Sequence, residues 1–458
     1  MSLLERGRVH FIGIGGAGMS AIAKVLLERG VEVSGSDLKR SRAAIQLEAM
    51  GATVHVGHEA EAVVGAGVVV VSAAIRPSNP ELLAAQEHGI PVLSRGQALA
   101  DVLAGHKSII VAGTHGKTTT TSMIVTILER AGLDPTYLIG AGLNDAGTNA
   151  RSGSGELAVA ESDESDGSFL LLSPSVAVVT NVEQDHVDHW ESMEALWEAF
   201  ASFIASTEDG GAVIVPGGDA RLEEIARSSG RRVVLFGEGG VTAEDASPGE
   251  RGIDFRLTYD GAGEKIALQV PGTHNVSNAL AAAAACLEVG VTLSQIASGL
   301  AAYSGVERRF QLRGEAAGVS IIDDYAHHPT EVKATLAAAR AGRWERVLAV
   351  FQPHRYSRTQ AFADDFGASF TDADRVVVTD VYGAGEEPVP GVSGKLISDA
   401  VCARLPGRPV AYLPHRAELV SYLKSSVRAG DAVLTMGAGD VTSLGEELLL
   451  ELRSGSTS

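Results

Sequence analysis

The chain has 458 residues, of which 45% are hydrophobic and 21% are charged. This composition is typical of a globular protein, and the length predicts about three domains. The net charge of −20 excludes a protein that binds nucleic acid or anionic membranes through a broadly basic surface. Two cysteines exclude a disulfide framework, and no apolar run is long enough to span a bilayer. Because the N-terminal segment also lacks a signal-peptide core, we expect a cytoplasmic protein.

The first motif is a glycine-rich turn. A buried strand at 9–14 enters Gly13-Ile-Gly15-Gly16-Ala-Gly18, a helix follows as far as Gly30, and a second strand ends near Asp37. This spacing predicts a dinucleotide-binding βαβ unit, in which glycines admit a diphosphate and an acid holds a ribose hydroxyl. The pattern indicates a ligand with a nucleoside diphosphate more firmly than it indicates NAD. A tight turn without a ligand is the alternative.

Strands and helices continue to alternate as far as residue 103. Apolar strands are predicted at 52–55, 68–71 and 91–93, with helical stretches between them. Such alternation favours a parallel sheet. Residues 104–106, Ala-Gly-His, are the expected linker into the next domain.

A second glycine-rich turn, Gly113-Thr114-His115-Gly116-Lys117-Thr118, lies between an apolar strand and an amphipathic helix. Backbone amides in such a turn point at an anion, and the helix N-terminus adds partial positive charge. Lys117 is expected to reach the β- and γ-phosphates, and the Thr118 hydroxyl is expected to ligate Mg²⁺. The full phosphate-loop pattern has glycine where this chain has Val111. We interpret the segment as a variant ATP-binding loop, and an ordinary turn is the alternative.

Two further residues, outside this loop, are candidate metal ligands. Glu161 ends the strand 157–160, and His186 follows the strand 176–179. Parallel sheets gather ligands at the carboxyl ends of their strands, so both side chains are expected near the phosphates. With Thr118 they offer donors that suit Mg²⁺ or Mn²⁺. The alternative is a solvated loop acid and a loop histidine.

Polar residues also cluster before the third domain. Asn275 and Asn278 precede an alanine-rich helix predicted at 279–287, where they either cap the helix or contact adenine or phosphate. Arg308 and Arg309 lie at a predicted hinge. This pair is either surface charge or a clamp for a phosphate across the domain gap.

The remaining strands predict another doubly wound layer. The strand 319–322 is followed by Asp323-Asp-Tyr-Ala-His-His328, and the strand 347–351 is followed by His354, Arg355 and Arg358. The two arginines are expected to bind a carboxylate or a phosphate in a bidentate manner. Further strands are predicted at 375–378 and 432–434.

These observations predict an α/β protein of three domains, each built on a mostly parallel sheet. Residues 1–104 are expected to form a Rossmann-like domain, residues 105–308 a central phosphate-loop ATPase-like domain, and residues 309–458 a C-terminal Rossmann-like domain.

Four motifs occur together in one order along the chain. They are Gly13-x-Gly-Gly-x-Gly-Met19, Gly113-Thr-His-Gly-Lys-Thr-Thr119, Asp324-Tyr-Ala-His-His-Pro329 and Phe351-Gln-Pro-His-Arg355. The set resembles the Mur ligases of peptidoglycan synthesis, in particular their alanine-adding branch, over essentially the whole chain. The resemblance implies ATP-dependent joining of L-alanine to the carboxylate of UDP-N-acetylmuramate through an acyl phosphate, by a monomer or homodimer. The N-terminal domain would bind the UDP-sugar, the central domain ATP and Mg²⁺, and the C-terminal domain the amino acid.

The resemblance also assigns roles to individual residues. The implied catalytic residues are Lys117, Arg309 and His115. The implied ATP-binding residues are Gly113, Thr114, His115, Gly116, Lys117, Thr118, Thr119, Asn275, Asn278, Arg309 and Asp324. The implied substrate-binding residues are Gly15, Gly16, Gly18, Asp37, Ser72, His328, His354, Arg355 and Arg358, and the implied metal ligands are Thr118, Glu161 and His186. Sister ligases carry a carbamoylated lysine near the metals, but this chain has no lysine between Lys117 and Lys265.

Three other functions compete with this interpretation. A recycling ligase would add a preformed tripeptide to the same UDP-sugar. An NAD(P)-dependent oxidoreductase would use the first glycine turn but would leave the second unexplained. A nucleotide sensor would bind ATP without releasing phosphate.

Overall fold

The N-terminal part of the chain forms a doubly wound sheet. The computed structural model describes residues 2–185, 189–249 and 252–455. The first sheet has the strand order β3-β2-β1-β4-β5, with parallel neighbours throughout, and this order is Rossmann-like. Its strands are β1 (Val9–Ile12), β2 (Val33–Asp37), β3 (Thr53–Val56), β4 (Val68–Val71) and β5 (Val92–Ser94). Its helices are α1 (Ala17–Glu28), α2 (Arg42–Ala49), α3 (Pro80–Glu87) and α4 (Arg95–Leu103), with short 3₁₀ turns η1 (Leu3–Glu5) and η2 (Ala60–Val63).

The central part contains a seven-stranded sheet of order β12-β11-β10-β6-β9-β7-β8, in which only the short β8 pairs antiparallel among the described strands. The strands are β6 (Lys107–Ala112), β7 (Thr136–Leu138), β8 (Ala150–Arg151), β9 (Leu157–Glu161), β10 (Val176–Val179), β11 (Ala212–Pro216) and β12 (Arg232–Phe236). The helical segments are α5 (Lys117–Arg130), η3 (Ser168–Leu171), α6 (Met193–Ala205), α7 (Ala220–Ser228), α8 (Thr273–Glu288) and α9 (Leu293–Ala302).

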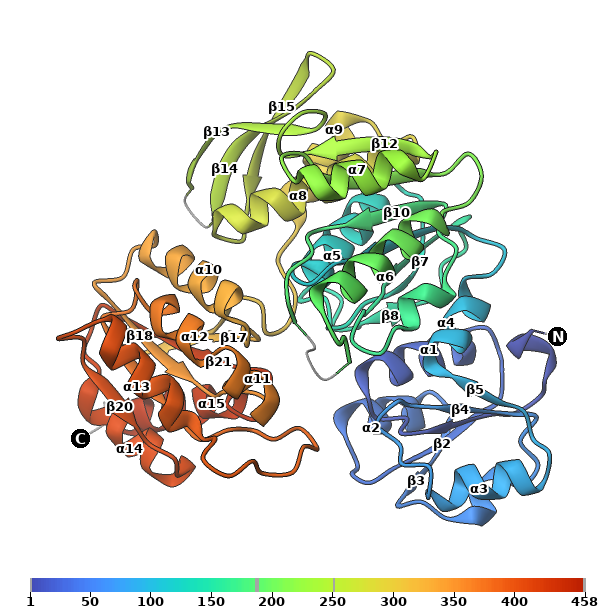
Figure 1. Cartoon of the computed structure of the whole chain (residues 1–458), viewed down its shortest axis with the longest axis horizontal. Coiled ribbons are helices and arrows are strands. Elements are labelled where there is room, and N and C mark those ends of the chain that lie inside the picture. The colour runs from blue at the N-terminus through green and yellow to red at the C-terminus, as the bar shows by residue number, and fades with distance from the viewer. Residues whose placement is uncertain (1, 186–188, 250–251, 456–458) are drawn as a thin grey trace.

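A small antiparallel sheet, which the sequence analysis did not predict, follows the central strands. It consists of β13 (Thr242–Pro248), β14 (Ile253–Tyr259) and β15 (Ala262–Leu268). It stands at the end of the central unit away from the N-terminal unit (Figure 1). The alternating burial of β14 explains its stability, because Ile253, Phe255 and Leu257 point into the core of the central unit.

The C-terminal part forms a sheet of order β16-β17-β21-β18-β19-β20, with β16 antiparallel and the other neighbours parallel. Its strands are β16 (Gln311–Ala316), β17 (Val319–Asp324), β18 (Arg346–Phe351), β19 (Arg375–Val378), β20 (Val410–Tyr412) and β21 (Asp431–Met436). Its helices are α10 (Pro329–Arg340), α11 (Tyr356–Ala361), α12 (Ala363–Ser369), α13 (Gly394–Arg404), α14 (Arg416–Ser426) and α15 (Thr442–Gly455). The predicted α/β class with mostly parallel sheets is therefore confirmed.

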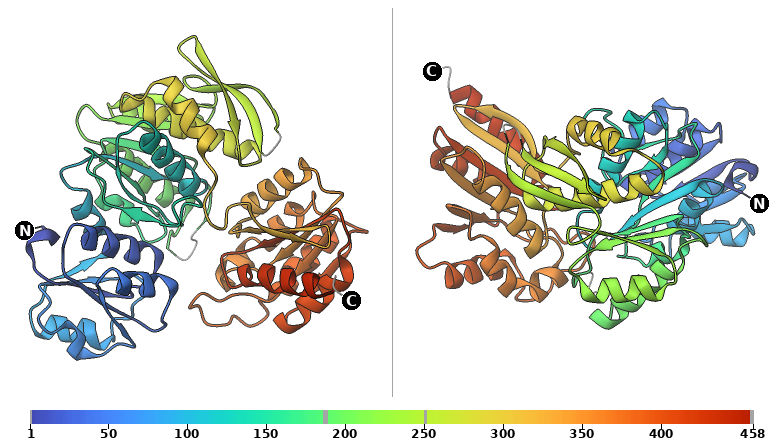
Figure 2. Two further views of the ribbon diagram at one scale, coloured as in Figure 1. Left: turned by 180° about the vertical axis from the view of Figure 1, so that it is seen from behind. Right: turned by 90° about the horizontal axis from the view of Figure 1, so that it is seen from above.

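The three larger sheets lie in separate units, with the N-terminal and C-terminal units on different sides of the central one (Figures 1 and 2). One hydrophobic core is continuous from the N-terminal sheet to one face of the central sheet, a second lies on the other face of the central sheet, and the C-terminal sheet has cores of its own. In β6, for example, Ile110 belongs to the first core and Ile109 and Val111 to the second, so the strand is buried on both faces. These units agree with the predicted three-domain organisation, whose exact boundaries at 104 and 308 stay predictions.

One local difference concerns the alanine-rich helix. Helix α8 begins at Thr273, before the predicted start at 279, so Asn275 and Asn278 lie within its first two turns. Both side chains are buried, and Asn278 Nδ2 donates to Asn275 Oδ1 at 3.2 Å. The run of alanines at 281–285 has no exposed surface, since it packs in the core of the central unit.

Candidate active site

The turn between β6 and α5 has the geometry of a phosphate-binding loop. Gly113 has φ 130° and Gly116 has φ 78°, a backbone region that side chains other than glycine rarely adopt. A Cβ atom at Gly116 would clash with Oδ1 of Asn278, and one at Gly113 would clash with Oγ1 of Thr180. Helix α5 begins immediately after the turn, at Lys117, so its first unpaired amides face the space over the loop. The second predicted glycine turn therefore has the backbone that anion binding requires.

Lys117 is mostly buried at the foot of this loop, with its side chain 11% exposed. Its Nζ atom donates to the carbonyl of Gly113 at 2.6 Å and to Oε2 of Glu164 at 2.8 Å. Burial opposes the charge of Lys117, but the carboxylates of Glu164 and Asp163 outweigh it and raise the pKa of Lys117. Burial likewise raises the pKa of Glu164 to about 7, although the lysine opposes this rise. The lysine is thus a charged group held by an acid that the sequence analysis did not single out.

Two of the three predicted metal ligands lie together. The Thr118 hydroxyl donates to Oε1 of Glu161 at 2.9 Å, and the other carboxylate oxygen of Glu161 accepts from the amide of Gly140 at 2.8 Å. An aligned hydroxyl and carboxylate are oxygen ligands of the kind that Mg²⁺ prefers. His186, the third predicted ligand, lies outside the described residues.

A second group of side chains could also hold a metal ion. Among the described residues, His115, Glu183 and His328 offer ligand atoms within 4.8 Å of one another. In the structure, however, His328 Nε2 faces the carbonyl of Gln184 at 3.1 Å, and His115 lies between two carboxylates. These contacts favour an ion-pair cluster over a metal centre.

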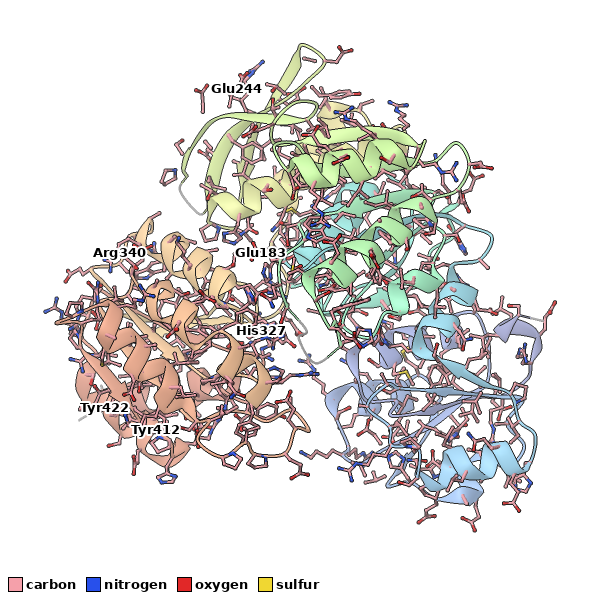
Figure 3. All side chains as sticks on the ribbon, viewed as in Figure 1. Glu183, Glu244, His327, Arg340, Tyr412 and Tyr422 are labelled. Carbon is pink, nitrogen blue, oxygen red and sulfur yellow. The ribbon has the colours of Figure 1, made fainter. Side chains whose placement is uncertain are left out.

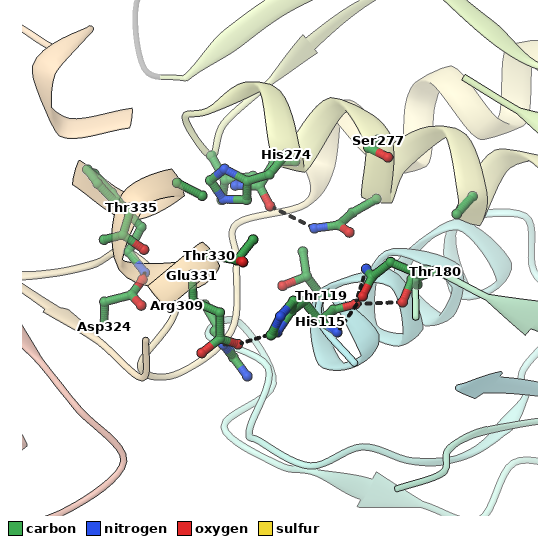
Figure 4. A pocket seen from close by; sticks show the side chains of 18 of the residues that line it. His115, Thr119, Thr180, His274, Ser277, Arg309, Asp324, Thr330, Glu331 and Thr335 are labelled. Atoms are coloured by element: carbon green, nitrogen blue, oxygen red, sulfur yellow. Dashed lines mark hydrogen bonds and ion pairs between the residues drawn. The ribbon is translucent and has the colours of Figure 1, made fainter. Parts of the chain in front are cut away.

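His115 is the central member of this cluster. Its Nε2 lies 3.4 Å from Oε2 of Glu183, and its Nδ1 lies 3.4 Å from Oε1 of Glu331. Burial alone would lower the pKa of His115, but hydrogen bonding to Glu183 and Glu331 raises it to about 9. Arg309 shares the same oxygen of Glu331, at 3.5 Å. Figure 4 shows His115 directed at Glu331, with Arg309 beside them.

These residues line a cavity of about 210 Å³ between the central and C-terminal units. The predicted residues His115, Gly116, Thr119, Asn275, Asn278, Arg309 and Asp324 all contribute to its wall (Figure 4). Burial raises the pKa of Asp324 to about 6, while its carboxylate accepts from the amides of Phe310 and Ala326, each at 2.7 Å. The structure thus brings most of the predicted ATP-binding residues to one place.

The hinge arginines have different surroundings. The guanidinium of Arg308 donates to the carbonyl oxygens of Gly437 and Gly439, at 2.6 and 3.2 Å. Arg309 instead lines the cavity. Of the two, only Arg309 lines the cavity, and its contact with a phosphate, which the resemblance implies, stays a prediction.

The first glycine turn lies in the N-terminal unit, outside this cavity. The amide of Gly15 donates to Oδ2 of Asp37 at 2.9 Å, and a Cβ atom at Gly15 would lie 2.7 Å from Oγ of Ser41. Ser72 packs against Gly13, and Gly16 precedes the first residue of α1. Thus Gly15, Gly16, Gly18, Asp37 and Ser72 surround one turn, as the βαβ pattern predicts.

A polar contact joins this turn to the central unit. Arg95 packs against Gly18, and its guanidinium donates to Oδ2 of Asp166 and to Oγ of Ser168, both at 2.9 Å. Asp166 belongs to the same acidic segment, 161–166, whose Glu164 holds Lys117. The two glycine turns are therefore connected through one short loop.

The predicted C-terminal substrate residues His328, His354, Arg355 and Arg358 are not among the residues that line this cavity, and each has its own partners. His354 stacks on Tyr382 with ring centres 5.8 Å apart, and burial lowers the pKa of His354 to about 3. Arg355 adopts φ 67° and lies 4.0 Å from Glu386. Arg358, which is 4% exposed, pairs with Asp185 of the central unit. Figure 3 shows Glu183 and His327 where these two units meet.

The sequence analysis missed four acids of the site, namely Glu164, Glu183, Asp185 and Glu331. Glu183 and Asp185 lie between the strand at 176–179 and His186, and Glu331 lies in the first turn of α10. Acids directly after a strand, or just after a proline that begins a helix, were the available signal.

A strand order of 3-2-1-4-5, a phosphate loop in the middle sheet and a cavity shared with a third sheet define a multidomain α/β nucleotide-binding enzyme. The models of three Mur ligase regions match this chain. They are the "Mur ligase family, catalytic domain" at 8–107, the "Mur ligase middle domain" at 111–286 and the "Mur ligase, glutamate ligase domain" at 308–439. The chain therefore belongs to the Mur ligase family.

Curated relatives and solved structures support this assignment. The chain is 49% identical to the UDP-N-acetylmuramate–L-alanine ligase of Saccharopolyspora erythraea, over 100% of this chain and 95% of the relative. It is 48% identical to the enzyme of the same name from Rubrobacter xylanophilus, over 97% and 100%. The crystal structure of UDP-N-acetylmuramate-alanine ligase from Thermotoga maritima matches with a TM-score of 0.83 and 29% identity, covering 98% and 99%. A murein peptide ligase from Psychrobacter arcticus matches with a TM-score of 0.73 and 26% identity, covering 98% and 99%.

No helix among residues 2–185, 189–249 and 252–455 combines the length and hydrophobicity that crossing a membrane requires.

Proposed function

We propose that this chain is an ATP-dependent ligase that joins L-alanine to the carboxylate of UDP-N-acetylmuramate in peptidoglycan precursor synthesis. The observation that carries the proposal is the cavity between the central and C-terminal units, where His115 and Gly116 of the phosphate loop share one wall with Arg309, Asp324 and Glu331 of the third unit. Full-length similarity to ligases of that name supports the same reaction. Because the reaction consumes ATP, a cytoplasmic location is part of the proposal, and a monomer or homodimer stays a prediction.

The phosphate loop suits a nucleoside triphosphate. Gly113 and Gly116 give the loop its positive-φ backbone, Lys117 follows Gly116 directly, and Arg309 lines the cavity, so two cations are available to the phosphates. Asn275, Asn278 and Asp324 also line the cavity, with Asn278 beside Gly116 of the loop, and we assign them to contacts with the nucleotide. In this proposal the γ-phosphate points toward Arg309 at the start of the C-terminal unit.

Thr118 and Glu161 would hold Mg²⁺, together with His186. The ion would neutralise charge on the transferring phosphoryl group. The oxygen ligands of Thr118 and Glu161 fit this role, since they adjoin the loop at the end of β9.

The flanking units would deliver the other two substrates. The turn at Gly15, Gly16 and Gly18 with Asp37 would bind the uridine diphosphate. Ser72 adjoins it. We assign the carboxylate of L-alanine to Arg355, with His328, His354 and Arg358 as further predicted contacts.

In the proposed reaction the muramoyl carboxylate attacks the γ-phosphorus of ATP, giving an acyl phosphate and ADP. The amine of L-alanine then attacks the acyl carbon, and phosphate leaves from the tetrahedral intermediate. Lys117, His115 and Arg309 stabilise negative charge on the phosphoryl oxygens. Contacts between the central and C-terminal units exclude water, which protects the acyl phosphate from hydrolysis.

The test is the release of ADP from ATP with UDP-N-acetylmuramate and each of several amino acids in turn. We expect release that requires both the sugar nucleotide and L-alanine. Lys117→Ala should reduce it by at least about a hundred-fold while the sugar nucleotide still binds. No release with any amino acid would reject the proposal.

A recycling ligase is the second candidate, because the Psychrobacter arcticus murein peptide ligase also matches the whole chain. A competition between L-alanine and a tripeptide separates the two. Preferential use of the tripeptide would replace the first proposal with the second.

A further inference from the structure

Glu331 is the point where cations from different parts of the chain meet. It lies in the first turn of α10, and its side chain is 11% exposed. One oxygen, Oε1, lies 3.4 Å from Nδ1 of His115 and 3.5 Å from Nη1 of Arg309. The other oxygen accepts from the amide of His327 at 3.0 Å. A single carboxylate therefore joins the phosphate loop, the hinge before β16 and the start of α10.

The charges around Glu331 are balanced. His115, Arg309 and His327 face Glu331 directly, and Glu183 lies on the opposite side of the His115 ring. Burial would raise the pKa of Glu331, but its basic neighbours hold this pKa well below its usual range. Burial lowers the pKa of His327 to about 4, so this ring is neutral near pH 7. Two carboxylates thus face two cations, His115 and Arg309, at the wall of the cavity.

We propose that Glu331 is a positioning residue that orients Arg309 and His115 toward the transferring phosphoryl group. This inference rests on the proposed function, since it assigns the two cations to the phosphate. An arginine has five N–H donors, so Arg309 can keep one edge on Glu331 while another edge meets a phosphate oxygen. Without Glu331, His115 keeps only Glu183 as a carboxylate partner and Arg309 loses its contact with the first turn of α10, so both cations can turn away from the γ-phosphate.

A structural role competes with this inference, because Glu331 also accepts from the amide of His327 near the start of its own helix. Loss of that hydrogen bond alone would lower the stability of the protein without changing kcat or the KM for ATP of the molecules that remain folded. The two roles therefore differ in kinetics measured per folded molecule.

The experiment is a double-mutant cycle of Glu331→Gln and Arg309→Lys, read as kcat and as the KM for ATP in the ADP-release assay. We expect Glu331→Gln to lower kcat about ten-fold or more, with a change of less than about three-fold in the KM for ATP. If Glu331 acts through Arg309, the double variant should be no slower than Arg309→Lys within about three-fold. If the fold-losses in kcat of the two single variants multiply in the double variant, Glu331 does not act through Arg309. That result, or an unchanged kcat in Glu331→Gln, would overturn the inference.

Glu447→Gln is the matched control, because Glu447 of α15 forms a half-exposed ion pair with Arg416 of α14 and its loss should leave kcat unchanged. Glu331→Asp keeps the charge but shortens the side chain by one methylene, so it should restore part of the lost kcat. It replaces Glu331→Gln in the cycle if that variant does not fold, and failure of both to fold would assign Glu331 a structural role and overturn the inference. Absence of ADP release from the unmodified chain would instead reject the proposed function.

Discussion

Asp185 and Arg358 form a bidentate ion pair between the central and C-terminal units. Arg358 Nη2 donates to both oxygens of Asp185, at 2.7 and 3.0 Å, and Nε donates to Oδ1 at 3.0 Å. Both side chains are at most 6% exposed. Beside this pair, Glu183 accepts from the hydroxyl of Thr330 at 2.7 Å, and the carbonyl of Gln184 faces His328. Residues 183–185 of the central unit therefore form a short contact segment, and each of its residues bonds to a residue of the C-terminal unit.

Asp185→Asn should weaken the contact between the central and C-terminal units, because it removes the negative charge of the ion pair with Arg358. Removing one partner of a buried pair leaves the other charge uncompensated and costs about 3–5 kcal/mol. Because the pair spans two units, we expect the cost to appear as looser closure, with kcat/KM for L-alanine reduced by more than about ten-fold. Asp399→Asn, which breaks an exposed pair with Lys395, is the control. Equal kcat/KM values in both variants would show that the pair does not hold the units together during turnover.

The pH dependence of stability should report His115. Its pKa in the folded protein is about 9, above the value of about 6.5 in an unfolded chain. The protonated ring between Glu183 and Glu331 therefore contributes stability that is fully present below pH 6.5 and is lost as the pH rises through 9. The contribution is on the order of 3 kcal/mol.

Urea unfolding of the unmodified chain and of His115→Gln, compared between pH 6 and pH 10, measures this contribution. We expect the difference in unfolding free energy between the two to shrink as the pH rises. A difference that stays constant over the whole range would contradict a protonated ring.

Two glycines provide a matched test of the phosphate loop. Gly116 and Gly132 both have φ 78°, but a Cβ at Gly116 meets Asn278 whereas one at Gly132 has nothing within 4 Å. Alanine at either position should cost about 1–2 kcal/mol of backbone strain. Only Gly116→Ala should also weaken nucleotide binding, which calorimetry with a non-hydrolysable ATP analogue measures. Equal affinities in the two variants would remove the loop from nucleotide binding.

The sequence predicted the features that depend on local pattern. The strand–turn–helix order at both glycine-rich turns was predicted from apolar strands followed by glycines, and Glu161 and Asp324 lie at the carboxyl ends of strands as expected. The contacts that complete the site could not be predicted in this way. Asp185 and Arg358 are 173 positions apart, so their pairing follows from how two units dock and not from either local segment.

Other differences have local causes. The antiparallel sheet formed by β13, β14 and β15 lies in a segment of weak strand signals and many glycines. The alternation of buried and exposed residues in β14 appears only when the strand packs on the core of the central unit. The early start of α8 was missed because Gly272 and the polar residues after it are typical of a loop. Neighbouring Arg308 and Arg309 could not be distinguished by pattern, since only the backbone geometry turns one of them away from the cavity.

Glu164→Gln should strengthen nucleotide binding. In this structure Glu164 accepts from Lys117 Nζ at 2.8 Å, so a triphosphate must compete with this carboxylate for the lysine. Removing the negative charge lessens the competition and also lessens repulsion of the phosphates. We expect the Kd for a non-hydrolysable ATP analogue with Mg²⁺ to fall by about three-fold or more at pH 8, where Glu164, with a pKa of about 7, is mostly ionised. At pH 6 the protonated acid already resembles glutamine, so the two proteins should bind the analogue more equally.

The control for Glu164→Gln is Asp209→Asn, at an exposed pair with Arg231, which should leave the Kd unchanged at both pH values. Weaker binding by Glu164→Gln at pH 8 would mean that the carboxylate orients the lysine toward the phosphates instead of competing with them.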